Sequence, residues 1–301
     1  MKSIIIYFSL TGNTKKVAKA IHKGMSQLVA HCDIATIKEV DIQYLGDYDL
    51  IGIGSPIWGG TPRNVRVFID TLPLLQGKHA FAFSTHGAMP EKLFPEVVSL
   101  LAEKGLAVIG VRDWYGSIYV PGHPKPYPTD GHPDEIDLKE AEDFGKEMVE
   151  LSRRISAGGP ELIPPLQMRP IPPPDGHPRA PKPQPKLNTQ KCRYPECRLC
   201  MDNCPQDAID LSVSPPVFAK KCWTCYFCEM ICPEGAVEVD YTAQAKATIW
   251  RCKNVYAKAL DDAEAEGRFR RLVPREDVDW DTPYYKIYNT HPRYVIPEES
   301  C

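Results

Sequence analysis

The chain has 301 residues, of which 43% are hydrophobic and 25% are charged, so it has room for two globular domains and is too apolar to be disordered throughout. Its formal net charge of −3 gives no basis for binding nucleic acid. No apolar run approaches the roughly 20 residues that cross a bilayer, and the N-terminus lacks the apolar core of a signal peptide, so we expect a cytoplasmic protein without membrane insertion.

Short β-rich runs alternate with helical patterns over residues 1–156. Strands are expected at residues 3–8, 33–37, 49–54, 78–84 and 106–112. Helices are expected between the strands at residues 13–30, 64–71 and 91–103, and a last helix is expected after them at residues 134–155. The alternation predicts an α/β fold in which a doubly wound, five-stranded parallel sheet is covered by helices on both faces.

Proline is too dense over residues 157–189 for a helix or a central strand. We expect an extended, semi-rigid linker there, which is either free or packed along a domain. Residues 190–240 contain an internal repeat and are expected to form a second, small α+β domain. Residues 241–301 carry no motif, and their mixed charges and aromatic side chains indicate a helix and an extended tail. That tail either covers this protein's own domains or binds a partner.

Eleven cysteines are present, and eight of them lie between Cys192 and Cys232. The cytoplasm keeps thiols reduced, so disulfides are not expected. Clustering of this kind indicates metal ligands instead. Cys32, Cys252 and Cys301 stand apart and are predicted not to be ligands.

The second repeat spaces its cysteines as the bacterial ferredoxin run C-x2-C-x2-C-x3-C-P, and the first repeat reads C-x4-C-x2-C-x3-C-P. In that run three thiolates hold one [4Fe–4S] cluster and the fourth reaches the other cluster. This crossing rule assigns the metal ligands as two sets: Cys192, Cys197, Cys200 and Cys232, and Cys222, Cys225, Cys228 and Cys204.

The longer first spacing leaves other interpretations open. C-x4-C-x2-C also begins plant-type [2Fe–2S] sites, although the following x3-C-P and the intact second repeat favour two [4Fe–4S] clusters. A [3Fe–4S] centre would leave Cys192 unused. Zinc would need four ligands in two pairs, whereas the sequence supplies two interleaved sets of four. Gly-His-Pro triplets at His123, His132 and His177 are interpreted as turns and not as metal sites.

A hydroxyl-rich turn lies between the first strand and the first helix. Backbone N–H groups and hydroxyls at a helix N-terminus form an anion site, and glycine lets the chain approach closely. The turn resembles the flavodoxin phosphate loop, S/T-x-T-G-N-T, at every defined position. That resemblance implies that FMN phosphate is bound by Ser9, Thr11, Gly12, Asn13 and Thr14.

Two further loops are similar to those that hold the flavin ring in flavodoxins. The loop after the third strand would lie along the ring through Pro56, Ile57, Trp58, Gly59 and Gly60. The loop after the fourth strand would contact the pyrimidine edge of the ring through Thr85, His86 and Gly87.

The loop at residues 114–133 is long for a segment without secondary structure, which is typical of functional loops. It follows the fifth strand at the carboxyl edge of the sheet, where such folds bind ligands. Tyr115 or Tyr119 is therefore expected to cover the outer face of the flavin.

Taken with the cysteine repeats, these loops make most of the chain resemble flavodoxin–ferredoxin fusion proteins. The resemblance implies FMN, two [4Fe–4S] clusters and electron transfer to or from an unidentified redox partner protein, in an anaerobic host. No catalytic residue is needed by a carrier of this kind. The linker makes a homodimer plausible, in which the FMN of one protomer faces a cluster of the other.

Two other functions stay open. One is an FMN-dependent reductase that reduces a small-molecule acceptor with electrons from the clusters, with residues 114–133 as a lid and His86 as a proton donor. The other is a flavodoxin unit that binds no FMN and serves as a docking platform.

Overall fold

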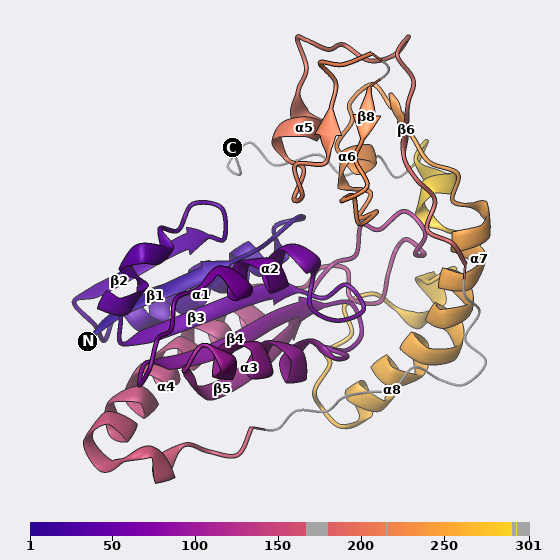
Figure 1. Ribbon diagram of the computed structural model, residues 1–301. Helices are drawn as coiled ribbons and strands as arrows, with labels where there is room; N and C mark the ends of the chain where they lie inside the picture. Colours follow the sequence, from indigo (N-terminus) through magenta and orange to yellow (C-terminus); the bar gives the residue numbers. More distant parts are fainter. Residues whose placement is uncertain (167–179, 215, 291–292, 294–301) are drawn as a thin grey trace. The chain divides into compact units, whose positions relative to one another are not determined.

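The computed structural model describes residues 1–166, 180–214, 216–290 and 293. His177 and Cys301, for which no ligand role was predicted, lie outside these residues. The chain divides into two compact units. One consists of Met1–Ser117 with Gly131–Pro172, and the other of Ile118–Asp130 with Pro173–Cys301 (Figure 1).

The first unit is built on a parallel sheet in the order β2-β1-β3-β4-β5. Its strands carry runs of buried aliphatic and aromatic side chains, as expected of a sheet covered on both faces. All five strands confirm the predicted ones, with bounds β1 Lys2–Tyr7, β2 His31–Thr36, β3 Leu50–Pro56, β4 His79–His86 and β5 Ala107–Tyr115.

Helices follow the strands as predicted: α1 (Asn13–Ser26), α2 (Arg63–Thr71), α3 (Leu93–Glu103) and α4 (Glu135–Gly158), with a 3-10 turn η1 (Ile42–Asp47) before β3 and a second, η2 (Pro160–Leu162), after α4. The strand order runs from β1 toward β2 on one side and from β3 toward β5 on the other. Right-handed crossovers therefore put α1 on one face of the sheet and α2 and α3 on the opposite face.

Helices α1 and α4 pack closely, and two glycines make this possible. A Cβ at Gly24 would lie 1.9 Å from the backbone oxygen of Glu142, and one at Gly145 would lie 2.4 Å from that of Ile21. The core that they close includes Phe81 and Phe83 of β4 and Phe144 of α4. No helix among the described residues is long and apolar enough to cross a membrane.

The second unit combines small sheets with helices (Figure 1). Two antiparallel pairs, β6–β9 and β7–β8, accompany two short helices, and a helical segment follows them. The elements are β6 Lys186–Leu187, α5 Leu199–Asp202, β7 Ile209–Asp210, β8 Val217–Phe218, α6 Phe227–Met230, β9 Val237–Glu238, α7 Thr242–Arg251, the π-helix η3 Cys252–Tyr256, α8 Ala257–Ala265, η4 Arg275–Asp277 and η5 Tyr284–Ile287.

Residues 118–130 belong to the second unit, although the sequence analysis grouped them with the sheet. The backbone N–H of Tyr284 donates to the carbonyl of His123 at 2.7 Å. Tyr127 is fully buried and packs edge-on against Trp280, with ring centroids 6.1 Å apart. The described part of the C-terminal tail therefore packs within its own unit, against a loop that begins three residues after the end of β5.

Candidate cofactor sites

The hydroxyl-rich turn lies between β1 and α1, as predicted. Gly12 caps α1 with φ 87°, a left-handed conformation that favours glycine, and its carbonyl accepts from Lys16 N–H at 2.9 Å. The Asn13 amide donates to the backbone oxygen of Ser117 at 2.8 Å. The Thr14 and Thr85 hydroxyls are hydrogen-bonded at 2.8 Å in a buried position. This last bond joins the turn to the end of β4.

The loop after β3 is shaped by two consecutive glycines with positive φ, Gly59 at 72° and Gly60 at 139°. Trp58, the aromatic residue expected to lie along the flavin, is half-buried. Its backbone N–H donates to the carbonyl of Gly60 at 3.1 Å. The carboxylate of Glu96 accepts from the backbone N–H of Thr61 at 2.9 Å. Pro56 and Ile57 precede these residues at the carboxyl end of β3.

Strands β4 and β5 end side by side, with His86 paired to Tyr115. The His86 side chain is 1% exposed, and its Nε2 lies 2.7 Å from the Oδ2 of Asp113, whose side chain is 37% exposed. The Tyr115 ring packs edge-on against the imidazole at 4.8 Å. His86 is thus fixed by a carboxylate that reaches solvent. Sequence reasoning missed Asp113, because a lone acid at a strand end gives no signal.

Several buried polar atoms near these loops have no hydrogen-bond partner among the described residues. They are the Ser9 hydroxyl, the Thr61 hydroxyl, the Asn64 amide and His86 Nδ1. Buried polar groups without a partner are costly, so a group with hydrogen-bonding atoms fits here. The carboxyl edge of this sheet therefore suits a phosphorylated, polar-edged ring such as FMN. The residue-by-residue contacts stay predictions, and Tyr119 lies in the other unit.

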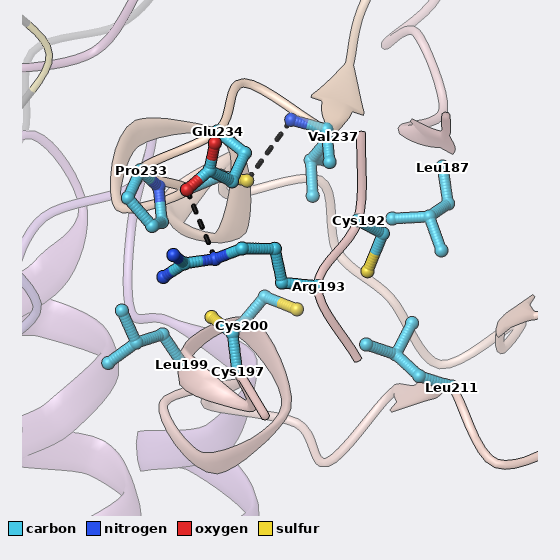
Figure 2. Close-up of a pocket in the computed structure, with 12 residues that line it drawn as sticks. Leu187, Cys192, Arg193, Cys197, Leu199, Cys200, Leu211, Pro233, Glu234 and Val237 are labelled. Carbon is cyan, nitrogen blue, oxygen red and sulfur yellow. Dashed lines mark hydrogen bonds and ion pairs between the residues drawn. The ribbon is translucent and has the colours of Figure 1, made fainter. Parts of the chain in front are cut away.

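The cysteine segment contains two cavities, each lined by four cysteines. The first has Cys192, Cys197, Cys200 and Cys232 in its wall (Figure 2). The second has Cys204, Cys222, Cys225 and Cys228 in its wall. Each cavity thus takes three cysteines from one repeat and the fourth from the other.

The first cavity also shows how the longer C-x4-C spacing is accommodated. Leu187, Leu211 and Val237 contribute apolar wall, and Arg193, inside the x4 segment, forms an ion pair with Glu234 at 3.1 Å (Figure 2). Cys192 remains in the wall of the cavity with Cys197 and Cys200. The two extra residues therefore do not remove Cys192 from its set.

The two repeats build matching turns after their Cys-Pro pairs. Asp207 and Gly235 hold equivalent positive-φ positions, at 46° and 59°. The next N–H in each repeat donates to a sulfur, Ala208 to Cys204 at 3.3 Å and Ala236 to Cys232 at 3.2 Å. The Cys222 sulfur accepts from the N–H of Thr224 at 3.4 Å. N–H donors of this kind suit sulfur that carries negative charge.

Burial and mutual repulsion act on these thiols. The pKa of Cys200 is raised to about 11, chiefly by burial and to a smaller extent by repulsion from the other three thiols of its set. Burial raises the pKa of Cys225 to about 11 and that of Cys228 well above its ordinary range. Metal ligation requires thiolates, so loading these sites releases protons.

The sulfurs are too widely spaced for a single tetrahedral ion. Among the described residues, no three cysteine sulfurs lie within 4.8 Å of one another. Three potential ligand atoms come that close in one group, which consists of His132, Asp134 and Asp137. Sulfurs around zinc, each about 2.3 Å from the metal, would lie about 3.8 Å apart. The histidine group itself is the N-cap of α4, where Asp134 accepts from two backbone N–H groups.

The model of the flavodoxin domain matches residues 4–104. A flavodoxin of Aquifex aeolicus is 34% identical over 130 residues, which cover 38% of this chain and 68% of that protein. The chain belongs to the flavodoxin family. The alignment with a solved flavodoxin from the domain Archaea covers 51% of this chain and 99% of the flavodoxin chain, with 25% identity and a TM-score of 0.41. A flavodoxin domain implies FMN as its cofactor.

A shorter similarity concerns ferredoxins. An uncharacterized ferredoxin of Methanocaldococcus jannaschii is 37% identical over 51 residues, which cover 16% of this flavodoxin-family chain and 82% of that protein. Together with the cysteine-rich segment, this similarity supports iron–sulfur binding. Flavodoxin and ferredoxin similarities both support electron transfer in general.

Proposed function

We propose that the chain is an electron carrier that holds FMN in its flavodoxin domain and two [4Fe–4S] clusters in residues 190–240. The observation that carries the proposal is the division of eight cysteines between two cavities, four to each, with the fourth cysteine exchanged between the repeats. FMN takes up one or two electrons, whereas each cluster takes up one. A chain with all three accepts electrons in pairs and delivers them singly.

The protein's own residues supply binding and orientation. In the first unit, the turn at Gly12 and the loops after β3 and β4 would hold the FMN phosphate and ring. In the second, the apolar residues that line the two cavities would limit the access of water to the clusters, and N–H donors would stabilise the charge on the sulfurs. No general acid or base is required. The partner is a redox protein, and we place the protein in the cytoplasm of an anaerobe.

Cysteine substitutions test the exchanged ligand sets. Cys228→Ala should reduce the iron content from about eight to about four atoms per chain, because it removes one ligand of one cluster. FMN stoichiometry should not change. Cys252→Ala is the matched control, since Cys252 is a buried cysteine of the same unit outside both cavities. Unchanged iron in Cys228→Ala would show that the ligand sets are wrong.

A second candidate function is reduction of a small acceptor at FMN. The observation that favours it is His86, which is buried, oriented by Asp113 and unpartnered at Nδ1 among the described residues. A histidine held by a carboxylate is a common proton donor. If this function is correct, His86→Gln should abolish steady turnover of a quinone while FMN remains bound. Absence of turnover in the unsubstituted protein would exclude it.

A further inference from the structure

The two cysteine repeats differ in one buried charge. Aligned through their cysteines, the repeats place Glu229 opposite Met201, each directly after the third cysteine of its run. Glu229 is 3% exposed. The acid that follows Met201 in the first repeat, Asp202, has a side chain that is 56% exposed. The second repeat therefore buries a carboxylate where the first has a thioether.

Two hydroxyl donors and one guanidinium surround Glu229, and they come from the helical and C-terminal segments. The hydroxyl of Tyr241 lies 3.3 Å from Oε2, and that of Tyr288 lies 3.1 Å from Oε2. Arg293 places its Nε 3.3 Å from Oε1, an ion-pair distance, and stacks over the Tyr288 ring at 4.9 Å. Burial raises the pKa of the Glu229 carboxyl, whereas the Arg293 guanidinium and the two hydroxyls act in the opposite direction and favour the ionised carboxylate.

The two charges are directed toward different cysteine sets. Tyr241, which bonds Glu229, packs edge-on against Tyr226 at 5.1 Å, and Tyr226 lines the second cavity. The guanidinium of Arg293 lies against Gly235, where a Cβ would be 2.4 Å from its Nη1. Gly235 belongs to the turn that follows Cys232 of the first cavity. The negative end of the pair thus faces the second set and the positive end the first.

Burial of the cysteines also makes the second cluster harder to reduce than the first. Cys204 and Cys225 of the second set are buried, whereas all four cysteines of the first set are half-buried. Reduction adds a negative charge to a cluster, which burial and a nearby carboxylate both oppose. N–H groups donate to sulfurs of both sets, for example Ala208 and Thr224 in the second and Ala236 in the first. These donors are neutral dipoles, whereas an ionised Glu229 carries a full charge.

We propose that the Glu229–Arg293 pair orders the two clusters, so that the cluster of Cys192, Cys197, Cys200 and Cys232 is reduced before that of Cys204, Cys222, Cys225 and Cys228. The inference rests on the proposed function, because it requires both clusters. Glu229 lowers the potential of the second cluster, and Arg293 raises that of the first. The C-terminal segment, which supplies Tyr288 and Arg293, thereby becomes part of the electron-transfer machinery.

The test is an EPR redox titration of the full chain, anaerobic and loaded with iron, sulfide and FMN. The spectrum of Cys225→Ala, which retains the first cluster, assigns the two signals. Glu229→Gln should raise the reduced-to-oxidised ratio of the second cluster about tenfold at a fixed potential, as expected for a unit charge roughly 10 Å away at an effective dielectric constant of about 20. Arg293→Gln should lower the ratio of the first cluster.

Asp202→Asn is the matched control, because it removes an exposed carboxylate and should change neither ratio. An unchanged second-cluster ratio in Glu229→Gln with full iron content overturns the proposal, as does an equal shift of both clusters. If the Glu229→Gln protein loses iron, the Arg293→Gln protein becomes the test. An unchanged reduced-to-oxidised ratio of the first cluster in that variant overturns the proposal. Iron measured first in the unsubstituted protein separates these results from failure of the proposed function, which would show as fewer than about eight atoms.

Discussion

The two units of this protein owe their order to different sources. Strands of the first unit have six to nine residues, and its core is continuous from β1 to α4. Strands of the cysteine segment have two residues each, and its core cluster includes Cys204 among four buried residues, with Cys192 and Cys200 packed against it. A sheet with its own core is stable without a cofactor, whereas a core made partly of ligands depends on what the ligands bind.

Removing iron should therefore affect the two units very differently. Extraction with a chelator and reductant should abolish amide-exchange protection over residues 186–240, because two-residue strands cannot sustain it alone. Protection in β1, β3 and β4 should persist. Hydrogen exchange followed by mass spectrometry measures both. Retained protection over residues 186–240 would show that the segment folds independently of its clusters and would remove the contrast.

The reverse experiment weakens the sheet. Phe81 is fully buried in β4 and packs edge-on against Phe144, with ring centroids 5.6 Å apart. Phe81→Ala should lower the free energy of unfolding of the first unit by about 3–5 kcal/mol, through lost burial and a cavity. Urea denaturation followed by circular dichroism measures this change. Iron content per chain should not change at neutral pH, and a parallel loss of iron would contradict separate sources of order.

Acid should loosen the loop of residues 118–130 within the second unit. The pKa of His123 is lowered to about 4, chiefly by burial and to a smaller extent by the nearby Arg251 guanidinium. In the unfolded chain this pKa is about 6.5, so the unfolded state binds more protons between these values. The stability that neutral His123 contributes is complete above pH 6.5 and is lost as the pH falls toward 4.

Comparison of His123→Gln with the unsubstituted protein isolates this effect. Amide exchange of residues 118–130, corrected for the intrinsic pH dependence, should accelerate below pH 6.5 in the unsubstituted protein. It should be nearly independent of pH in the variant. The same acceleration in both proteins would assign the effect to another group.

The smallest expected effect concerns the cap of α4 in the first unit. Asp134 accepts from the N–H groups of Ile136 and Asp137, and Asp137 completes a capping box. Asp134→Ala should cost about 1 kcal/mol, the usual value for such a cap. Urea denaturation of the first unit measures it, and the clusters should be unaffected. A decrease in the free energy of unfolding as large as that of Phe81→Ala would show that Asp134 stabilises more of the unit than the end of α4.

The sheet could be predicted because its signals are local. Each strand is a β-rich run, and each helix shows its own spacing, so β1 to β5 were found to within three residues at each end. The cysteine sets follow from fixed spacing and a known crossing rule, and the two cavities group the same residues. What depends on distant partners was missed. Tyr284 binds the loop at His123, and Tyr288 binds Glu229, across sequence separations that no local pattern reports.

A buried acid is the hardest of these to predict. Glu229 lies in the short helix α6, and a glutamate is ordinarily exposed. Its partners Tyr241, Tyr288 and Arg293 all come from later in the chain. Likewise β6 lies inside the proline-rich stretch and pairs with β9 50 residues later, although the sequence indicated a linker throughout.

Quantification of iron, acid-labile sulfide and flavin per chain after anaerobic purification tests the central claim most directly. The account predicts about eight irons, about eight sulfides and one FMN, the content of two four-iron clusters and one flavodoxin site. Eight irons without FMN, in protein refolded with excess flavin, would contradict the carrier mechanism and leave a ferredoxin joined to a flavodoxin fold that binds no flavin.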